Sequence, residues 1–373
     1  MNSMNDFKGV ITNQVVDSYK LENSKKIRTI TISDLHNYTS DYKKASRLAN
    51  AIKEKNPDII FIAGDIYNGG KSWENKNKLE DLKIFLQNIS EVAPVCITWG
   101  NHDIFGMNSI NKYIRLKNFY DLERVRCGSV FPLFNNRVSI NDMEIIGYVP
   151  SLGLMSNEGL KTQIHGVAHD KFIKEYEEYG IKFKNNPNDL TVYLGHVPHL
   201  IASSENGVGL GSLKVCDYFI TGHVHDGYRA LFSKFNNIKK FITGEDINSF
   251  KYDRGLVEQP TGLVDKDNKF IKGSNKILGN TNLCRGIVYF DDMSQQKIWQ
   301  SSDGIFYKNM TNEINKQDWQ LFSENDARKE ILDNKLHSML ISEGISQLMI
   351  PIEKYATINV VDINGVNTNK RTR

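Results

Sequence analysis

The chain has 373 residues, of which 40% are hydrophobic and 24% are charged, so we expect a soluble globular protein with a sizeable core, in one large domain or two smaller ones. Its formal net charge of +3 permits an anionic substrate but does not require nucleic acid. The sequence contains no apolar run as long as a membrane span, no secretory signal pattern and no disulfide framework among its four scattered cysteines. We therefore expect a cytoplasmic location.

The first part of the chain shows an alternation of strand-like and helix-like segments. Apolar residues recur at helical spacing over residues 41–55 and 78–90. Short apolar runs of strand length flank these segments, and a polar turn at Asn23 and Ser24 separates the first two runs. The strands are expected at residues 13–23, 25–34, 58–65 and 94–101. This order predicts parallel strands with crossover helices.

Beyond Arg126 the pattern favours antiparallel strands. Residues 129–150 predict a pair of antiparallel strands around a turn at Asn135 and Asn136, and a polar helix is expected over about 170–179. Further strands are expected at residues 190–196, 216–223, 286–292 and 296–309, the last range with a turn at Asp303 and Gly304. We therefore predict an α/β (mixed α+β) fold, in which two mixed sheets pack as a sandwich flanked by helices.

The C-terminal part of the sequence predicts one more helix and one more strand. Ser323 is expected to cap a helix that runs to about Ser342. The apolar side of this helix would carry Ala327, Ile331, Leu332, Met339 and Leu340. Residues 356–365 have the pattern of a strand, and we interpret the KRTR ending as part of a solvated tail rather than as a polyanion contact.

Five of the strand-like runs end in Asp, Asn or His. The endings are Asp34-Leu35-His36, Gly64-Asp65, Gly100-Asn101-His102-Asp103, Gly195-His196 and Gly222-His223-Val224-His225. Ligands bind at the carboxyl ends of strands in open α/β sheets, because the loops there converge on one crevice. We therefore expect these endings to meet in a single site, since solvated strand ends would not repeat this composition five times.

The side chains in these endings have the chemistry of a two-metal site. Asp and His suit divalent ions such as Mn, Fe and Zn, and the endings contain no cysteine for a thiolate site. Paired ions roughly 3.5–4 Å apart can share a hydroxide and clamp the attacking and leaving oxygens of an in-line displacement. The expected ligands are Asp34, His36, Asp65, Asn101, His196, His223 and His225. With one bridging carboxylate, the residual positive charge favours a phosphate oxyanion.

The ordered motifs DLH, GD, GNHD, GH and GHVH resemble those of the calcineurin-like metallophosphoesterase superfamily, over roughly residues 26–290. The resemblance implies a sandwich of two mixed sheets, in agreement with the order of the elements. It also implies a division of the ligands, with Asp65 bridging two ions. One ion would be held by Asp34, His36 and His225, and the other by Asn101, His196 and His223.

The resemblance further implies a role for the GNHD motif beyond metal binding. His102 would protonate the leaving oxygen or steady the phosphoryl group, because an imidazole can transfer a proton near neutral pH. Asp103 would orient His102, and a loop-capping aspartate is the alternative interpretation. Asn37, directly after DLH, and Asp226, directly after GHVH, are candidate substrate contacts.

Differences from the motifs of known subclasses indicate which members of the superfamily the chain resembles. The segment GDIYNGG has Asn68 and Gly69 where the protein Ser/Thr phosphatases of the superfamily carry an Asp-Arg pair. Tyr67 stands one residue before the position of the ligand tyrosine in purple acid phosphatases. The chain looks more like the small bacterial phosphoesterases of mixed substrate range.

We predict a metal-dependent phosphohydrolase that cleaves a phosphomonoester, phosphodiester or pyrophosphate bond with a metal-held hydroxide. Its cofactors would be two divalent metal ions, with manganese expected and iron or zinc as alternatives, and its substrate a phosphorylated small molecule or nucleotide. The alternatives are a nuclease or cyclic-nucleotide phosphodiesterase, although no basic stripe with interleaved aromatics indicates nucleic acid, and a non-catalytic binding scaffold. We assign residues 1–320 to the catalytic domain and residues 321–373 to a C-terminal extension, and we predict no particular oligomeric state.

Overall fold

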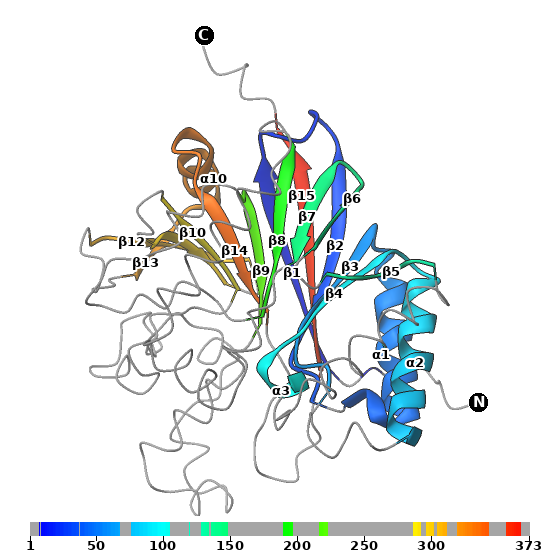
Figure 1. The fold of residues 1–373 in the computed structure, drawn as a ribbon. Helices are drawn as coiled ribbons and strands as arrows, with labels where there is room; N and C mark the ends of the chain where they lie inside the picture. Colours follow the sequence, from blue (N-terminus) through cyan, green and yellow to red (C-terminus); the bar gives the residue numbers. More distant parts are fainter. Residues whose placement is uncertain are drawn as a thin grey trace, which may run out of the picture.

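Two mixed β-sheets pack against each other in the part of the chain that the computed structural model describes (Figure 1). The described residues are 7, 9–36, 38–67, 76–104, 119, 128–133, 136–147, 189–196, 216–222, 286–291, 296–301, 304–311, 319–342 and 356–366. This arrangement confirms the predicted α/β class with two mixed sheets.

The first sheet has six strands in the order β1-β15-β2-β3-β4-β5. Their bounds are β1 Gly9–Ser18, β15 Ala356–Gly365, β2 Lys26–Ile32, β3 Ile59–Ala63, β4 Val95–Thr98 and β5 Val130–Pro132. The strands from β2 to β5 are parallel, as the alternation of strands and helices predicts. Strand β15 lies between β1 and β2, parallel to the first and antiparallel to the second, so the two N-terminal strands are not neighbours.

The second sheet has nine strands in the order β13-β12-β11-β10-β14-β9-β8-β7-β6. Their bounds are β6 Asn136–Ile140, β7 Met143–Gly147, β8 Leu190–Leu194, β9 Tyr218–Thr221, β10 Gly286–Phe290, β11 Gln296–Gln300, β12 Phe306–Asn309, β13 Trp319–Phe322 and β14 His337–Ile341. The strands β7, β8, β9 and β14 form a parallel centre. The antiparallel part that the sequence predicts consists of β10 to β13 on one side and β6 on the other.

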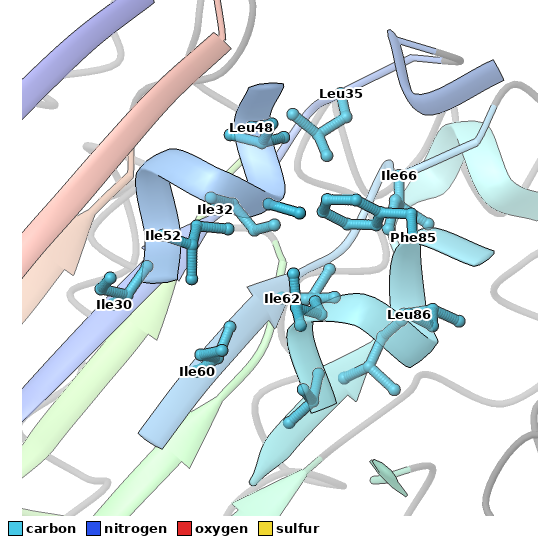
Figure 2. Close-up of a cluster of buried hydrophobic side chains, with 14 of the residues drawn as sticks. Ile30, Ile32, Leu35, Leu48, Ile52, Ile60, Ile62, Ile66, Phe85 and Leu86 are labelled. Carbon is cyan, nitrogen blue, oxygen red and sulfur yellow. The ribbon is translucent and has the colours of Figure 1, made fainter. Parts of the chain in front are cut away.

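Helices α1 (Tyr42–Glu54) and α2 (Lys76–Ser90) cover the outer face of the first sheet (Figure 1). Helix α1 begins where the side chain of Asp41 accepts hydrogen bonds from the backbone N–H groups of Lys43 and Lys44. Apolar side chains of both helices and of strands β2 and β3 form one buried core, part of which is shown in Figure 2. Its labelled members include Ile30, Ile32, Leu48, Ile52, Ile60, Ile62, Phe85 and Leu86. The other described helices are η1 (Tyr38–Ser40), α3 (Asn101–Ile104) and α10 (Glu324–Asp333).

A second apolar core lies between the two sheets. It joins side chains of β3, such as Phe61, to side chains of β8 and β14, such as Val192 and Leu340. Ala327 and Ile331 of α10 also belong to this core. The two sheets are therefore held in a fixed relation by buried apolar contact.

The hairpin predicted after Arg126 forms at a different turn. Strands β6 and β7 are joined by Asn141 and Asp142, which have φ angles of 50° and 61°, rather than by Asn135 and Asn136. A two-residue hairpin turn of type I′ needs positive φ at both positions, and Asn and Asp tolerate this conformation better than most other side chains. The segment before Asn135 forms β5, which pairs in parallel with β4 in the other sheet.

The predicted C-terminal helix is shorter than expected. Ser323 caps α10 as predicted, but the helix ends at Asp333 and is followed by Lys335 with a φ of 50°. The residues Met339 and Leu340, which we expected on a helix face, are fully buried in β14. An interior strand is apolar on both faces, so its sequence resembles the apolar side of a buried helix.

Two further observations concern the extent of the fold. The strand predicted at residues 356–365 forms as β15, whereas the helix expected over residues 170–179 lies outside the described residues. Within the described ranges, no helix combines the length and the apolar character needed to cross a membrane.

We predict that the chain shortened to residues 1–320 does not fold cooperatively. The deletion removes the interior strands β14 and β15, including the fully buried Met339, Leu340, Ile358, Val361 and Ile363. Burial of one such side chain contributes about 2 kcal/mol, and a whole domain is stable by only about 10 kcal/mol. Thermal unfolding followed by circular dichroism, with a chain ending at residue 366 as control, measures this. A 1–320 chain that melts cooperatively near the temperature of the control contradicts the prediction.

Candidate metal centre

The carboxyl ends of strands from both sheets meet at one site. Asp34 follows β2, Asp65 follows β3 and His196 follows β8. Backbone hydrogen bonds tie these endings together: the N–H of Asp34 donates to the oxygen of Gly64 at 3.0 Å, and the N–H of His36 donates to that of Asp65 at 2.9 Å. Helix α3 lies at the same end of the molecule (Figure 1). The structure thus brings together the endings whose side chains it describes.

Three residues of the site have left-handed backbone conformations. The φ angles are 52° for Asp34, 43° for His36 and 51° for Asp65. This conformation costs a residue other than glycine about 1 kcal/mol or more, and such strain concentrates at functional sites. In this protein the three residues lie in the DLH and GD segments, whose backbones hydrogen-bond to each other.

The side chains of the site converge on one oxygen of Asp65. Oδ2 of Asp65 lies 3.2 Å from Nε2 of His196 and 3.9 Å from Nε2 of His36. Nε2 of His196 is also 4.0 Å from Oδ1 of Asp34. Within the described residues this Asp65 oxygen is buried and has no hydrogen-bond partner, although His196 is so close. Carboxylate and imidazole donor atoms that lie this close together in a buried site can serve as ligands of shared ions.

Two groups of potential metal ligands share Asp65. Donor atoms of Asp34, Asp65 and His196 lie within 4.8 Å of one another, and so do those of His36, Asp65 and His102. Asp34 is therefore grouped with His196, whereas the family resemblance implies that it binds the same ion as His36. Both groups contain the residue that the resemblance implies as the bridge.

The charges of the site are strongly coupled. Burial by itself would raise the pKa of Asp65, but the nearby imidazoles, that of His196 first, lower it below the ordinary value of a carboxyl group. Burial would likewise lower the pKa of His196, but the carboxylates, that of Asp65 first, raise it to about 10. Two buried carboxylates thus draw positive charge into this site, as a proton or as a cation.

Asp103 connects the GD and GNHD segments. Its carboxylate accepts backbone hydrogen bonds from Asp65 (2.8 Å), Tyr67 (2.9 Å) and Gly100 (2.9 Å). Burial, and then the negative charge of Asp65, raise the pKa of Asp103 to about 8. The side chain is fully buried and acts as a cap for two loops, since it fixes the backbone on both sides of the central carboxylate.

His102 is attached to the same carboxylate through its backbone. Its N–H donates to Oδ1 of Asp65 at 2.6 Å, and its ring lies edge-on to that of His36, with the ring centroids 4.5 Å apart. The side chain is half-buried, unlike those of Asp34 and Asp65. The imidazole of His102 is therefore grouped with His36 and Asp65 and is partly exposed to solvent.

Glycine is required where the two loops touch. A Cβ atom at Gly100 would overlap Oδ1 and the backbone nitrogen of Asp65. Only a residue without a side chain allows the GNHD backbone to approach the Asp65 carboxylate and hydrogen-bond to it. The motif glycine thus has a steric reason that its position in the sequence does not reveal.

The remaining residues expected at the site fall outside what the structure describes. These are Asn37, His223, His225 and Asp226, together with the side chain of Asn101, whose backbone begins α3. Residues that sequence reasoning missed include Ser33, next to Asp34, and Ser342, whose hydroxyl groups are 2.9 Å apart. They are 309 residues apart in the chain, so no local sequence pattern could connect them.

The described part of the site fits divalent metal ions. It offers buried carboxylate oxygens and imidazole nitrogens, the donors that manganese, iron and zinc accept. A buried carboxylate oxygen without a hydrogen bond is costly, and a cation would satisfy it.

The family model for the calcineurin-like phosphoesterases matches residues 27–227, more than half of the chain, and the protein belongs to this family. No curated protein matches the sequence. Among solved structures, TT1561 of Thermus thermophilus is similar, with 12% identity and a TM-score of 0.32 over 53% of this chain and 82% of that chain. A dimetal phosphatase from Danio rerio is similar with 14% identity and a TM-score of 0.32, over 59% of this chain and 83% of that chain.

Membership of this family makes the protein a hydrolase that acts on phosphoric esters, and more specifically a metal-dependent phosphoesterase. The family uses dinuclear sites for divalent ions, and the described residues contain candidate ligand groups for them. Its substrates are phosphorylated molecules.

We predict that Asp103→Ala destabilises the protein and weakens its metal binding. The change leaves three buried N–H groups without their acceptor, and each such group costs about 1–3 kcal/mol. Thermal unfolding and Mn²⁺ titration measure the two effects. The control is Asp81→Ala, which removes a half-buried aspartate from α2. Equal unfolding temperatures and equal Mn²⁺ affinities for the two variants contradict the loop-capping role.

Proposed function

We propose that the protein hydrolyses a phosphomonoester, phosphodiester or pyrophosphate bond in a phosphorylated small molecule or nucleotide, at a site for two divalent ions that share Asp65. The observation that carries the proposal is the position of Asp65 Oδ2, which is buried within 3.9 Å of Nε2 of both His36 and His196. Bound cations would neutralise phosphate charge and lower the pKa of a water nucleophile.

The proposed ligands come from both sheets. Asp34, His36, Asp65 and His196 are supported by their convergence and burial. Asn101, His223 and His225 are proposed from the family motifs. We propose manganese as the ion, with iron or zinc as alternatives, because carboxylate and imidazole donors without thiolate suit these metals.

His102 is proposed as the general acid that donates a proton to the leaving oxygen. Its backbone bond to Asp65 holds the imidazole beside the ligands, and its partial exposure leaves room for a substrate. Asp103 is proposed to act indirectly, by fixing the backbone of Asp65 and the loop that carries His102. Asn37 and Asp226 are proposed as substrate contacts from their places next to the motifs.

The residues proposed for catalysis all lie within 1–320, which we propose as the catalytic part of the chain. Residues 321–373 would then serve it structurally, because β14 and β15 are interior strands of the two sheets.

We predict that Mn²⁺ supports hydrolysis of p-nitrophenyl phosphate or its bis ester, that EDTA abolishes it, and that Asp65→Asn lowers kcat at least about 100-fold. The substitution removes the charge of the proposed shared ligand, on which both ions depend. Release of p-nitrophenol measures the rate.

The matched control is Asp58→Asn, at the opposite end of β3. Asp58 accepts a hydrogen bond from the backbone of Arg28 and lies outside the site, so its replacement should leave the rate nearly unchanged. Undiminished turnover by Asp65→Asn, or turnover that persists in EDTA, contradicts the proposal.

We predict that metal affinity rises with pH. The carboxylates of Asp65 and Asp34 raise the pKa of His196 to about 10, so its imidazole is protonated at neutral pH before a cation binds. A cation must displace this proton, and release of one proton makes the affinity rise up to about tenfold per pH unit between pH 6.5 and 8.5.

Calorimetric titration with Mn²⁺ in two buffers of different ionisation enthalpy measures the released proton. His337→Gln, at the start of β14, is the control and should keep the release, because His337 contacts the backbone of Cys216 away from the site. An affinity independent of pH, with equal heats in both buffers, contradicts the prediction.

A further inference from the structure

A chain of buried polar side chains crosses from one sheet to the other directly behind Asp34. The hydroxyl of Thr12 on β1 donates to Oδ1 of Asn359 on β15 at 3.2 Å. Nδ2 of Asn359 donates to the hydroxyl of Ser342, just after β14, at 2.8 Å. The hydroxyl of Ser33, just after β2, donates to the same Ser342 oxygen at 2.9 Å. All four residues are buried, and this series of hydrogen bonds ends at Ser33, next to the proposed metal ligand Asp34.

Ser33, at the end of this series of hydrogen bonds, is packed tightly against the site. A Cβ atom at Gly222 would lie 2.7 Å from Oδ2 of Asp34 and 2.9 Å from Oγ of Ser33. The backbone N–H of Ser342 donates to the oxygen of Thr221 at 2.8 Å, which places Ser342 beside Gly222. Ser33, Asp34 and Gly222 therefore form a tight junction, and Ser342 is its support from the second sheet.

This junction is polar, whereas much of the contact between the sheets is apolar. Side chains such as Phe61, Val192 and Leu340 form the apolar part, and Gln14 of β1 makes a further polar contact with the backbone oxygens of Gln300 and Ser301. Asn359 also donates to the oxygen of Thr31 at 3.2 Å, so its amide group is bound on both sides. Apolar contact would hold the sheets together equally well, but it is non-directional, whereas a bonded polar network fixes one geometry.

We propose that Ser342 and Asn359 are positioning residues of the metal centre, which hold Ser33 and through it orient Asp34 for metal binding. The inference rests on the proposed function, because it concerns the same ligands. It assigns a role in metal binding to two strands outside residues 27–227, the range that the family model matches. The C-terminal strands β14 and β15 therefore complete a site to which they contribute no ligand.

Strand β14 offers a matched pair of residues for the test. Ser338 and Ser342 are both buried serines of this strand segment, but Ser338 lies at its amino end, where its hydroxyl donates to the oxygen of Asp217. Loss of the Ser342 hydroxyl removes two buried hydrogen bonds, and loss of the Ser338 hydroxyl removes one part-buried hydrogen bond. Only the loss at Ser342 should disturb Asp34.

The experiment compares Ser342→Ala and Asn359→Ala with Ser338→Ala in the full chain. Mn²⁺ affinity is measured by electron paramagnetic resonance of the free ion, unfolding temperature by calorimetry, and turnover with p-nitrophenyl phosphate. We expect Mn²⁺ affinity about tenfold weaker or more in the first two variants, as for other residues that orient ligands, and within about twofold of wild type in Ser338→Ala. Ser342→Cys, which keeps the shape and weakens the hydrogen bonds, gives the same comparison if Ser342→Ala does not fold.

The outcomes separate this inference from the function on which it rests. A wild-type protein that neither binds Mn²⁺ nor hydrolyses phosphate esters overturns both. A wild-type protein that does both, together with variants at Ser342 and Asn359 that bind Mn²⁺ as tightly as Ser338→Ala, overturns the positioning role alone. Weaker Mn²⁺ binding in the variants at Ser342 and Asn359, at unfolding temperatures similar to that of Ser338→Ala, supports it.

Discussion

Two fully buried carboxylates in one small volume are the constraint on which the rest of the site depends. Asp34 and Asp65 both lie within 4.0 Å of Nε2 of His196. Ionised groups in a protein interior cost several kcal/mol each unless opposite charge compensates them. The imidazoles supply part of this compensation, and divalent cations would supply the rest. Replacing buried ionic groups with apolar residues is often neutral or stabilising for a fold, so stability alone does not account for these carboxylates, whereas the proposed metal binding does.

The surrounding structure serves to hold these carboxylates in place. The strained backbone at Asp34 and Asp65 is maintained by hydrogen bonds between the loops. Three backbone N–H groups that donate to the Asp103 carboxylate add to this support. The two sheets meet at the same point, where Ser342 supports Ser33 from across the interface. The unit that positions the site is therefore larger than the segment that carries the motifs, because strands from both ends of the chain lie inside the sheets.

Local patterns predicted much of the fold. Helical spacing located α1 within one residue, and apolar runs located β3, β4, β8 and β9. The predictions failed where two local solutions were equally good. Both Asn135-Asn136 and Asn141-Asp142 can form a turn, and the apolar run around Met339 suits a helix face or an interior strand. Pairing with distant strands decided each case, because burial in a sheet contributes more than local propensity.

The sequence by itself determined the chemistry of this protein. The order and composition of five strand endings indicate a two-metal phosphoesterase, since few other functions need Asp, Asn and His at these positions. Tertiary structure alone decided which groups hold those side chains in place. The insertion of β15 between β1 and β2, the binding of loop amides by Asp103 and the contact of Ser33 with Ser342 join residues far apart in sequence. Such contacts are selected by the packing of complete sheets, in which each buried polar group must find a partner, and no local pattern records them.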